Sequence, residues 1–551
     1  MTHQKRIIRL SRLVAGSVAS MTMAAMAAVA VLGVVTVNPV PLSAATSCED
    51  LAKISLPNVR ITLAKSIAAG AFTPPPAPAR GGGAGGGGAA PAAGAAAGGG
   101  GRGGPAFTDL APFCQVQATL APSSDSDIKM EAWLPAESVW NLKLMGVGNG
   151  GLGGGVGVNA GGLANGVRLG YVTVGSNTGH EGDTTYAREH PEKIKDWGWR
   201  SGHEMTIVAK ALIKAHYSRP LLRSVVAQGG GGTMLSLSSA QRFPEDYDFI
   251  AATGMSSHFS RHTMGQLWVW MATHKDEASA LPMEKLAVLH QGALDACDSH
   301  DGLKDGVIGQ PERCKFDPVV IQCKGADGSS CLTAPQVEAV RKIYAGPTNP
   351  RTKAEIYSPL YPGSELTWAA MASTPQPFGI AINWFRDFVF KDPNWDYRTR
   401  PVNFDSDAAA TDKVVDGNNV SPDLTKFFAR GGKLLLIEGW SDTTVPPKVA
   451  IDYYKNVVAK TGAGPTRQSM RFFMVPGMGH GPGTNGEENF NFTALNILEE
   501  WAETGRAPDT LIVDHYKNGM MVGKRLVCQY PMTPTYNGTG NTEDPASFAC
   551  K

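Results

Sequence analysis

The apolar positions after residue 127 follow two repeating patterns, which predict strands and an amphipathic helix. Residues 128–134 alternate between apolar and polar side chains, and residues 142–147 form a mostly apolar run; both patterns are typical of strands. Residues 204–217 instead repeat their apolar side chains every three or four positions, which predicts a helix with one apolar face. That face carries Met205, Val208, Ala209, Leu212 and Ile213.

The same patterns recur along the chain and predict a mainly parallel sheet. Further strands are predicted at 171–174, 224–227, 434–438 and 472–475, and a helix is predicted at 233–241. Strands that alternate with helices are typical of a parallel sheet with helices on its faces. Between about 256 and 425 the pattern changes to aromatic, loop-rich sequence that contains cysteines. We therefore predict an α/β protein whose core is formed by residues 46–255 and 426–551, with a lid domain inserted at 256–425.

Residues 1–45 have the pattern of an export signal. A basic segment contains Lys5, Arg6, Arg9 and Arg12. It precedes an uncharged apolar run at 13–37, and after two prolines come small residues at 42–45 that suit a signal peptidase. The alternative is a permanent anchor, because the apolar run is long enough to span a bilayer. We expect cleavage, no stable membrane anchor, and a periplasmic or secreted protein.

Composition narrows the class of protein. The chain has 551 residues, a net charge of +1 and a pI near 7.6, so it lacks the basic character of a nucleic-acid-binding protein. Its 65 glycines are concentrated in part at 74–106, a stretch of almost pure Pro, Gly and Ala. Such a stretch cannot bury a core, so we predict a flexible loop there. The remaining composition is that of a globular protein, most simply an enzyme.

The eight cysteines all lie beyond the predicted signal, and exported chains usually pair their cysteines. Their spacing predicts the pairs Cys48–Cys114, Cys297–Cys314, Cys323–Cys331 and Cys528–Cys550. The alternative is zinc ligation, which is disfavoured because the chain contains no C-x-x-C motif.

Two glycine-rich turns follow predicted strands. Residues 146–151 formally match the G-x-G-x-x-G pattern of a dinucleotide-binding loop, but the following residues remain glycine-rich and predict no helix. We favour an oxyanion loop, in which backbone N–H groups face a developing negative charge. Residues 228–233 lie between a strand and a helix, where an α/β-hydrolase places its nucleophile, yet they contain no Ser, Cys or Asp. Asp442 and His480 follow later strands, in the chain order of that fold's acid and histidine.

Asp298, Asp301 and Asp305 form a compact acidic loop together with two glycines. Carboxylates at alternating turns suit calcium, which takes six to eight oxygen ligands. The alternative is a solvent-exposed acidic turn. A disulfide between the flanking Cys297 and Cys314 would close and pre-organise the loop.

These residues together resemble the tannase and feruloyl esterase family, which includes bacterial mono(hydroxyethyl) terephthalate hydrolase. The segments that carry the resemblance are 47–51, 146–151, 240–246, 388–396, 431–436 and 475–480. The resemblance covers nearly the whole mature chain and implies an α/β-hydrolase core, a large lid and a calcium site in the lid. It implies that Asp298, Asp301 and Asp305 supply carboxylates and that Leu303 and Val307 supply backbone carbonyls. It also implies activity on esters of phenolic acids or related aromatic carboxylates.

The chain departs from the family pattern around one site. The family has Gly-Cys-Ser-x-Gly-Gly at the elbow, and counting back from Ala240 places Gly229 at the cysteine and Gly230 at the nucleophilic serine. The family's second cysteine follows its histidine, where this chain has Gly481, so both partners of that disulfide are missing. Glu438 stands where the family commonly has histidine, whereas Asp442 and His480 remain.

The departures leave three functions open. First, His480, oriented by Asp442, activates water for hydrolysis of an aromatic ester, with an oxyanion site formed by Gly150, Gly151 and Gly231. Second, the same dyad abstracts a proton from an aromatic substrate, as in a lyase or isomerase. Third, the protein binds a small aromatic compound without turnover. A relocated nucleophile at Ser236, Ser238 or Ser239 is disfavoured, because these residues lie further along the predicted helix. We expect the first function.

Overall fold

The computed structural model describes residues 46–74, 107–155, 160–414, 420–483 and 488–551, and residues 44–551 form one compact unit. The predicted export signal and nearly all of the predicted glycine-rich loop lie outside the described residues. In the part that is described, no helix has both the length and the apolar character needed to span a bilayer.

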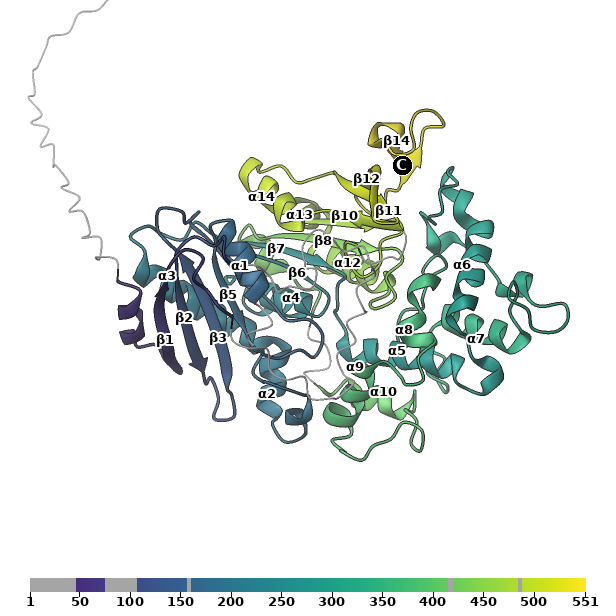
Figure 1. The fold of residues 1–551 in the computed structure, drawn as a ribbon, viewed down its shortest axis with the longest axis horizontal. Helices are drawn as coiled ribbons and strands as arrows, with labels where there is room; N and C mark the ends of the chain where they lie inside the picture. The colour runs from purple at the N-terminus through teal and green to yellow at the C-terminus, as the bar shows by residue number, and fades with distance from the viewer. Residues whose placement is uncertain (1–45, 75–106, 156–159, 415–419, 484–487) are drawn as a thin grey trace, which may run out of the picture. The chain divides into compact units, whose positions relative to one another are not determined.

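A nine-stranded sheet forms the centre of the protein (Figure 1), in the spatial order β1-β2-β3-β5-β4-β6-β7-β8-β9. Its strands are β1 (Val59–Ile67), β2 (Phe113–Leu120), β3 (Ile128–Pro135), β4 (Lys143–Val147), β5 (Val172–Ser176), β6 (Arg223–Gly229), β7 (Phe249–Thr253), β8 (Lys433–Gly439) and β9 (Met470–Val475). Strands β1, β2, β3 and β5 pair antiparallel, whereas β5, β4, β6, β7, β8 and β9 pair parallel. The carboxyl ends of the parallel strands therefore meet along one edge, where α/β sheets place their sites.

The predicted α/β core is confirmed, and each strand predicted from the sequence is present. Strands β8 and β9 are almost entirely buried, which explains their continuous apolar sequence, because helices cover both faces of a parallel sheet. Strands β1, β2 and β7 of this sheet were not predicted; β1 is an edge strand whose residues are mostly exposed or half-buried, so it lacks a clear apolar pattern.

The expectation that no helix follows the first glycine loop is wrong, because α1 (Ala160–Arg168) begins nine residues after Gly151. Its glycines allow close packing on the sheet. A Cβ at Gly162 would lie 2.6 Å from Val147 Cγ1, and one at Gly166 would lie 2.2 Å from Thr173 Cγ2. Glycine normally disfavours a helix, so its role in helix–sheet contact was invisible in the sequence. The predicted helices at 204–217 and 233–241 correspond to α3 (Ser201–His216) and α4 (Gly232–Arg242).

The segment between β7 and β8 is more helical than its sequence predicted. It contains α5 (Phe259–Thr273), α6 (Met283–Cys297), α7 (Ala334–Ala345), α8 (Ala369–Ala372), α9 (Gly379–Asn383), α10 (Ser406–Thr411) and α11 (Thr425–Ala429). Helix α5 buries polar side chains such as His262 and Gln266 as well as apolar ones, so it lacks a single apolar face. This segment, the predicted lid, has an apolar cluster of its own and shares a second cluster with the sheet. Figure 1 shows α5, α6, α7 and α8 grouped together.

Two smaller sheets complete the chain. Strands β10 (Glu488–Asn491), β11 (Thr510–Lys517) and β12 (Met520–Cys528) form an antiparallel sheet, and β13 (Pro534–Tyr536) pairs with β14 (Phe548–Cys550). Helices α12 (Lys448–Thr461) and α13 (Ala463–Ser469) lie between β8 and β9 in the chain, and α14 (Ala494–Thr504) lies between β10 and β11.

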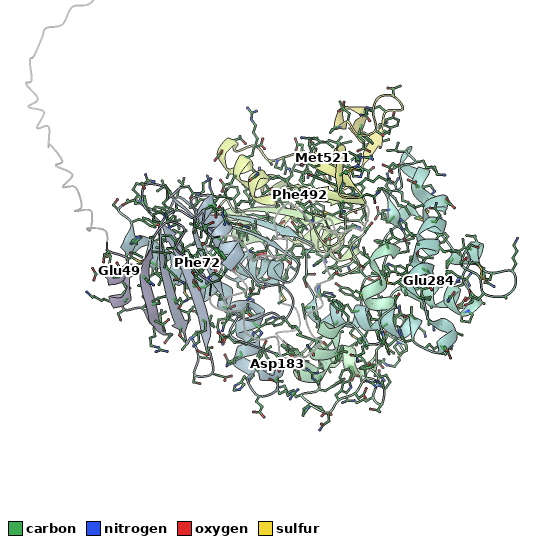
Figure 2. All side chains as sticks on the ribbon, viewed as in Figure 1. Glu49, Phe72, Asp183, Glu284, Phe492 and Met521 are labelled. Atoms are coloured by element: carbon green, nitrogen blue, oxygen red, sulfur yellow. A yellow bond between two sulfur atoms is a disulfide. The ribbon has the colours of Figure 1, made fainter. Side chains whose placement is uncertain are left out.

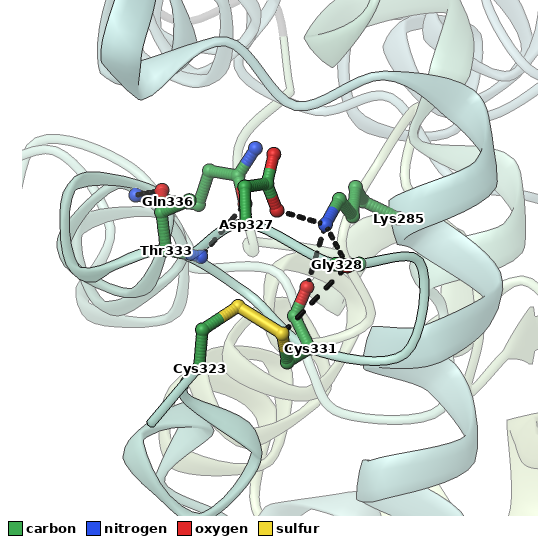
Figure 3. The surroundings of a disulfide bond; sticks show 7 residues. All are labelled: Lys285, Cys323, Asp327, Gly328, Cys331, Thr333 and Gln336. Carbon is green, nitrogen blue, oxygen red and sulfur yellow. Dashed lines mark hydrogen bonds and ion pairs between the residues drawn. A yellow bond between two sulfur atoms is a disulfide. The ribbon is translucent and has the colours of Figure 1, made fainter. Parts of the chain in front are cut away.

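All four predicted disulfides are present, and the structure has no free cysteine among the described residues. In Figure 3 the Cys323–Cys331 bridge closes a loop beside the buried Lys285. The Lys285 ammonium group donates to Asp327 Oδ1 at 2.6 Å and to the carbonyl oxygens of Gly328 and Cys331 at 2.6 and 2.7 Å. The bridge and this ammonium group therefore fix the same loop.

The predicted loop at 74–106 is fixed at both of its described ends. Phe72, which Figure 2 labels, packs on Phe107 and Trp133 with ring centroids 5.0 and 4.5 Å apart. Cys48 is bonded to Cys114, and β1 pairs with β2 on either side of the loop in the chain. An insertion between such fixed ends is tolerated because the cost of closing a loop grows slowly with its length.

Candidate active site

A sharp turn joins β6 to α4 at Gly230. Its backbone has φ = +54°, a left-handed conformation that favours glycine, and its N–H donates to Thr253 O at 3.0 Å. A Cβ at this position would lie 2.7 Å from His480 Nε2, closer than side-chain atoms normally approach. This strand–turn–helix geometry is that of a nucleophile elbow, and the imidazole lies directly against the position of the missing side chain.

Asp442 and His480 lie in the loops after β8 and β9 and form a hydrogen-bonded pair. His480 Nδ1 lies 2.7 Å from Asp442 Oδ2, and Asp442 Oδ1 accepts from the backbone N–H groups of Thr444 and Val445 at 2.8 and 2.9 Å. The Asp442 side chain is fully buried, whereas 29% of the His480 side chain is exposed. The aspartate is therefore fixed behind the ring, and Nε2 is the nitrogen that faces Gly230.

The pair also sets the basicity of the histidine. Burial alone would lower the pKa of His480, but the negative charge of Asp442 and the hydrogen bond from the ring outweigh burial and raise that pKa. A histidine oriented in this way can accept and return a proton near neutral pH.

Two further glycines allow the loop that carries His480 to pack closely on the ends of β7 and β8. Gly254, with φ = +61°, follows β7, and a Cβ there would lie 3.0 Å from His480 Nδ1. A Cβ at Gly439 would lie 2.1 Å from Met478 O, in the loop that carries His480. Neither role was predictable from the sequence, because each depends on a contact between distant segments.

The first glycine loop, after β4, lies directly on the elbow. A Cβ at Gly231 would lie 2.2 Å from the backbone nitrogen of Gly151, so the two backbones are in contact. Within the described residues the N–H groups of Gly150, Gly151 and Gly231 donate no hydrogen bond. Trp197 Nε1 donates to Gly151 O at 3.2 Å and so fixes the loop from its other side. Free amides from these two segments are the donors of an oxyanion site in this fold.

The serines and threonine of α4 do not face the histidine. Ser236 Oγ donates to Thr233 O at 3.0 Å and, like Ser238 and Ser239, is buried. Thr233 Oγ1 donates to Gly230 O at 2.6 Å and accepts from the N–H of Ser256 at 2.9 Å. Among the described residues, Asp442 is the only hydrogen-bond partner of His480. None of the serines considered from the sequence is therefore placed to act as its nucleophile.

Glu438 is a residue whose role in the site the sequence did not reveal. It is fully buried in β8 and accepts hydrogen bonds from the N–H groups of Met255 and Gly439 at 2.9 and 3.1 Å. It lies beside Asp442, and the two carboxyl groups interact. The sequence signals were its position at the start of the Glu-Gly-Trp-Ser-Asp segment and the histidine that the family commonly has at this position.

The acidic loop lies after α6 and is held largely by its own backbone. Asp298 accepts from the N–H groups of Asp305 and Gly306 at 3.2 and 3.0 Å, and Asp301 accepts from the N–H of Leu303 at 3.0 Å. Burial raises the pKa of Asp301 to about 6, and the charges of Asp305 and Asp298 add to this effect, whereas the hydrogen bond from Leu303 opposes it. Burial therefore disfavours the ionised form of Asp301 unless a positive charge lies nearby.

The surroundings of this loop partly fit a cation. A cavity of about 30 Å³ is lined by four of the five predicted ligands, Asp301, Leu303, Asp305 and Val307. Arg525 lines it as well and pairs with Asp305 at 2.8 Å. No cluster of three His, Cys, Asp or Glu side chains able to hold a metal occurs in the described ranges, so backbone carbonyls would have to complete the site. The donor set is therefore carboxylate and carbonyl oxygen, which suits calcium rather than zinc.

The elbow after β6, the acid after β8 and the histidine after β9 define the chain as an α/β-hydrolase. The tannase and feruloyl esterase family model matches residues 114–551, and the chain belongs to that family.

Relatives and solved structures agree with this assignment. An uncharacterized esterase of Xanthomonas campestris is 33% identical over 92% of each chain, and a probable feruloyl esterase B-2 of Aspergillus terreus is 30% identical over 80% of this chain and 86% of its own. The crystal structure of feruloyl esterase B from Aspergillus oryzae has a TM-score of 0.80 and 27% identity, and covers 92% of this chain and 99% of its own. A tannin acyl hydrolase from Aspergillus niger shares the fold, with a TM-score of 0.69 and 18% identity over 90% of this chain and 92% of its own.

Proposed function

We propose that this protein hydrolyses an aromatic carboxylic ester by direct attack of water, without an acyl-enzyme. The observation that carries the proposal is that His480 Nε2 lies against the Cβ position of residue 230, where glycine supplies no hydroxyl group to act as a nucleophile. Membership of the tannase and feruloyl esterase family, with relatives named probable feruloyl esterases, supports the ester and aromatic class of substrate.

The proposed reaction needs only groups that the site contains. His480 Nε2 removes a proton from water while the water oxygen attacks the ester carbonyl carbon. The carbonyl oxygen becomes negative and accepts hydrogen bonds from the free N–H groups of Gly151 and Gly231. The carbon–oxygen bond to the alcohol then breaks, and His480 returns its proton to the departing oxygen. Asp442 remains ionised and holds the ring throughout.

The remaining parts of the proposal concern location and calcium. Four disulfides are typical of proteins in oxidising compartments, which supports export to the periplasm or the medium. Calcium, held by Asp301 and Asp305 with the carbonyls of Leu303 and Val307, would stabilise the loop and take no part in the reaction, whereas Asp298 does not line the cavity and instead accepts backbone N–H groups.

Product analysis tests the reaction. The protein is incubated with a panel of aromatic esters and with aromatic compounds that lack an ester, and the products are identified by mass. Hydrolysis releases an acid and an alcohol, and His480→Ala should slow it by about 10²–10⁴-fold. A product of unchanged mass would indicate an isomerase, elimination products would indicate a lyase, and binding without any product would indicate a binding protein. Full activity of His480→Ala would overturn the proposal.

The absence of an acyl-enzyme is tested on the intact protein. We expect no mass increase during turnover and no labelling by a serine-directed phosphonate. Gly230→Ala should lower turnover at least about ten-fold, because a methyl group 2.7 Å from Nε2 displaces both the water and the ring. Gly230→Ser is the matched variant, since it adds a hydroxyl at the same atom; an acyl-enzyme in this variant alone would place a nucleophile's position at residue 230. Labelling of a native serine such as Ser236 would contradict the water mechanism.

A further inference from the structure

Glu438 is a buried acid that the proposed reaction does not use. It lies one residue before the end of β8 and is fully buried, and Asp442 lies four residues further on, also fully buried. Glu438 interacts with Asp442, and Asp442 Oδ2 lies 2.7 Å from His480 Nδ1, so the three side chains form a connected row.

The surroundings of Glu438 supply no positive charge. Its Oε2 accepts from the N–H of Met255 and its Oε1 from the N–H of Gly439, and no Lys or Arg pairs with it in the described ranges. The titratable groups near the row are Tyr357 from the lid segment, which interacts with both carboxyl groups, and His262 from α5, which interacts with Asp442 and His480. Burial lowers the pKa of His262 to about 4, so this histidine is neutral and does not balance a second carboxylate.

Asp442 has the hydrogen bonds of an ionised carboxylate. Its Oδ1 accepts two backbone N–H groups, and its Oδ2 accepts from His480 Nδ1. One lone pair of Oδ2 remains for a further donor. Two carboxylates that share a buried site do not both ionise near neutral pH, because each opposes the charge of the other. The carboxyl group that is stabilised by a histidine and by more hydrogen-bond donors keeps the negative charge, and that group is Asp442.

We infer that Glu438 is protonated at neutral pH and donates a hydrogen bond to Asp442, so that it acts as a positioning residue that limits the basicity of His480. Burial raises the pKa of Glu438 well above its usual value, and the neighbouring charge of Asp442 raises it further, while the hydrogen bond from Met255 opposes these effects. A neutral Glu438 leaves one negative charge behind the imidazole, whereas an ionised Glu438 would place two there. The inference concerns the site of the proposed function, but the position of the proton is measurable without a substrate.

The test is a titration of His480 by NMR, in protein labelled at its histidine rings, with the signal assigned by its loss in His480→Ala. Glu438→Gln keeps a donor of the same shape, and Glu438→Met keeps the volume but removes every hydrogen bond. We expect the pKa of His480 to stay close to that of the native protein in Glu438→Gln. In Glu438→Met we expect it to rise by about one unit, because Asp442 loses a donor and becomes more basic.

An ionised Glu438 predicts the opposite shift in the pKa of His480. If Glu438 is ionised, both substitutions remove a negative charge near the ring and both lower the pKa of His480, which would overturn the inference. A purely structural role would leave that pKa unchanged in both variants, and this result would overturn it too.

A second measurement does not depend on how Glu438→Met folds. The infrared C=O stretch of a protonated carboxylic acid should be present in the native protein at neutral pH and absent from Glu438→Gln. Its absence from the native protein would show that Glu438 is ionised. Failure of the hydrolysis proposal is recognised separately, by full activity of His480→Ala, and leaves both measurements of the proton unaffected.

Discussion

The candidate active site and the acidic loop both bury several carboxyl groups, but they balance the negative charge differently. At the active site Asp442 is balanced by a histidine and two backbone N–H groups, and we infer that Glu438 is balanced by its own proton. In the acidic loop the balance comes from backbone N–H groups and from Arg525, which cannot lose its proton.

This difference matches what each region can do. Groups that exchange protons near neutral pH suit acid–base chemistry, whereas a fixed guanidinium or a metal ion suits a structural site. The two regions are also in contact: a Cβ at Gly477, three residues before His480, would lie 3.0 Å from Val307 Cγ1 in the acidic loop. The loop therefore supports the backbone that carries the histidine.

Removal of the fixed charge should have the largest effect on stability. Arg525 pairs with Asp305 at 2.8 Å and with Glu543 at 2.9 Å, and only 12% of its side chain is exposed. Arg525→Met leaves Asp305 without its cation and leaves Glu543 with His515 Nδ1, 2.7 Å away, as its remaining partner, and we expect the free energy of unfolding to fall by about 2–4 kcal/mol in denaturant melts. The control is Lys524→Met, which removes an exposed neighbouring cation and should change stability by no more than about 0.5 kcal/mol. Equal effects of the two substitutions would show that the buried pairing contributes nothing.

Calcium removal should have the next largest effect. A chelator is expected to lower the melting temperature by about 3–5 °C, because an ion that binds only the folded state stabilises it. Asp301→Asn should abolish this response, whereas Asp295→Asn, on the exposed side of α6, should keep it. An unchanged melting curve of the native protein, together with no calcium by elemental analysis, would remove the metal from the acidic loop and leave Arg525 as its counter-ion.

The smallest effect should come from the titration of the active site. Because the folded protein raises the pKa of His480, the resulting stability is fully present below about pH 6.5, the ordinary histidine value, and is lost as the pH rises through the folded-state pKa. His480→Gln should therefore destabilise the protein by about 1 kcal/mol more at about pH 5.5 than at about pH 8.5. His274→Gln serves as the control. A difference between native protein and His480→Gln that does not change with pH would mean that Asp442 does not favour the charged ring.

Much of the fold was predictable because burial leaves a local pattern. Alternating or continuous apolar runs in the sequence mark the strands β3, β4, β5, β6, β8 and β9. All four disulfides join cysteines whose pairing was predicted from their spacing. Helix α1 was missed because Gly162 and Gly166 weaken the local helical signal and act only against the sheet.

The sequence by itself determined the α/β architecture, the cysteine pairs, the family resemblance and the order of Gly230, Asp442 and His480. It did so because these properties depend on residue type, periodicity and order along the chain. Only the tertiary structure decided that His480 Nε2 faces Gly230, that the amides of Gly151 and Gly231 meet, and that Glu438 is buried beside Asp442. These properties depend on distance, burial and charge between segments up to 250 residues apart, and no local pattern records them.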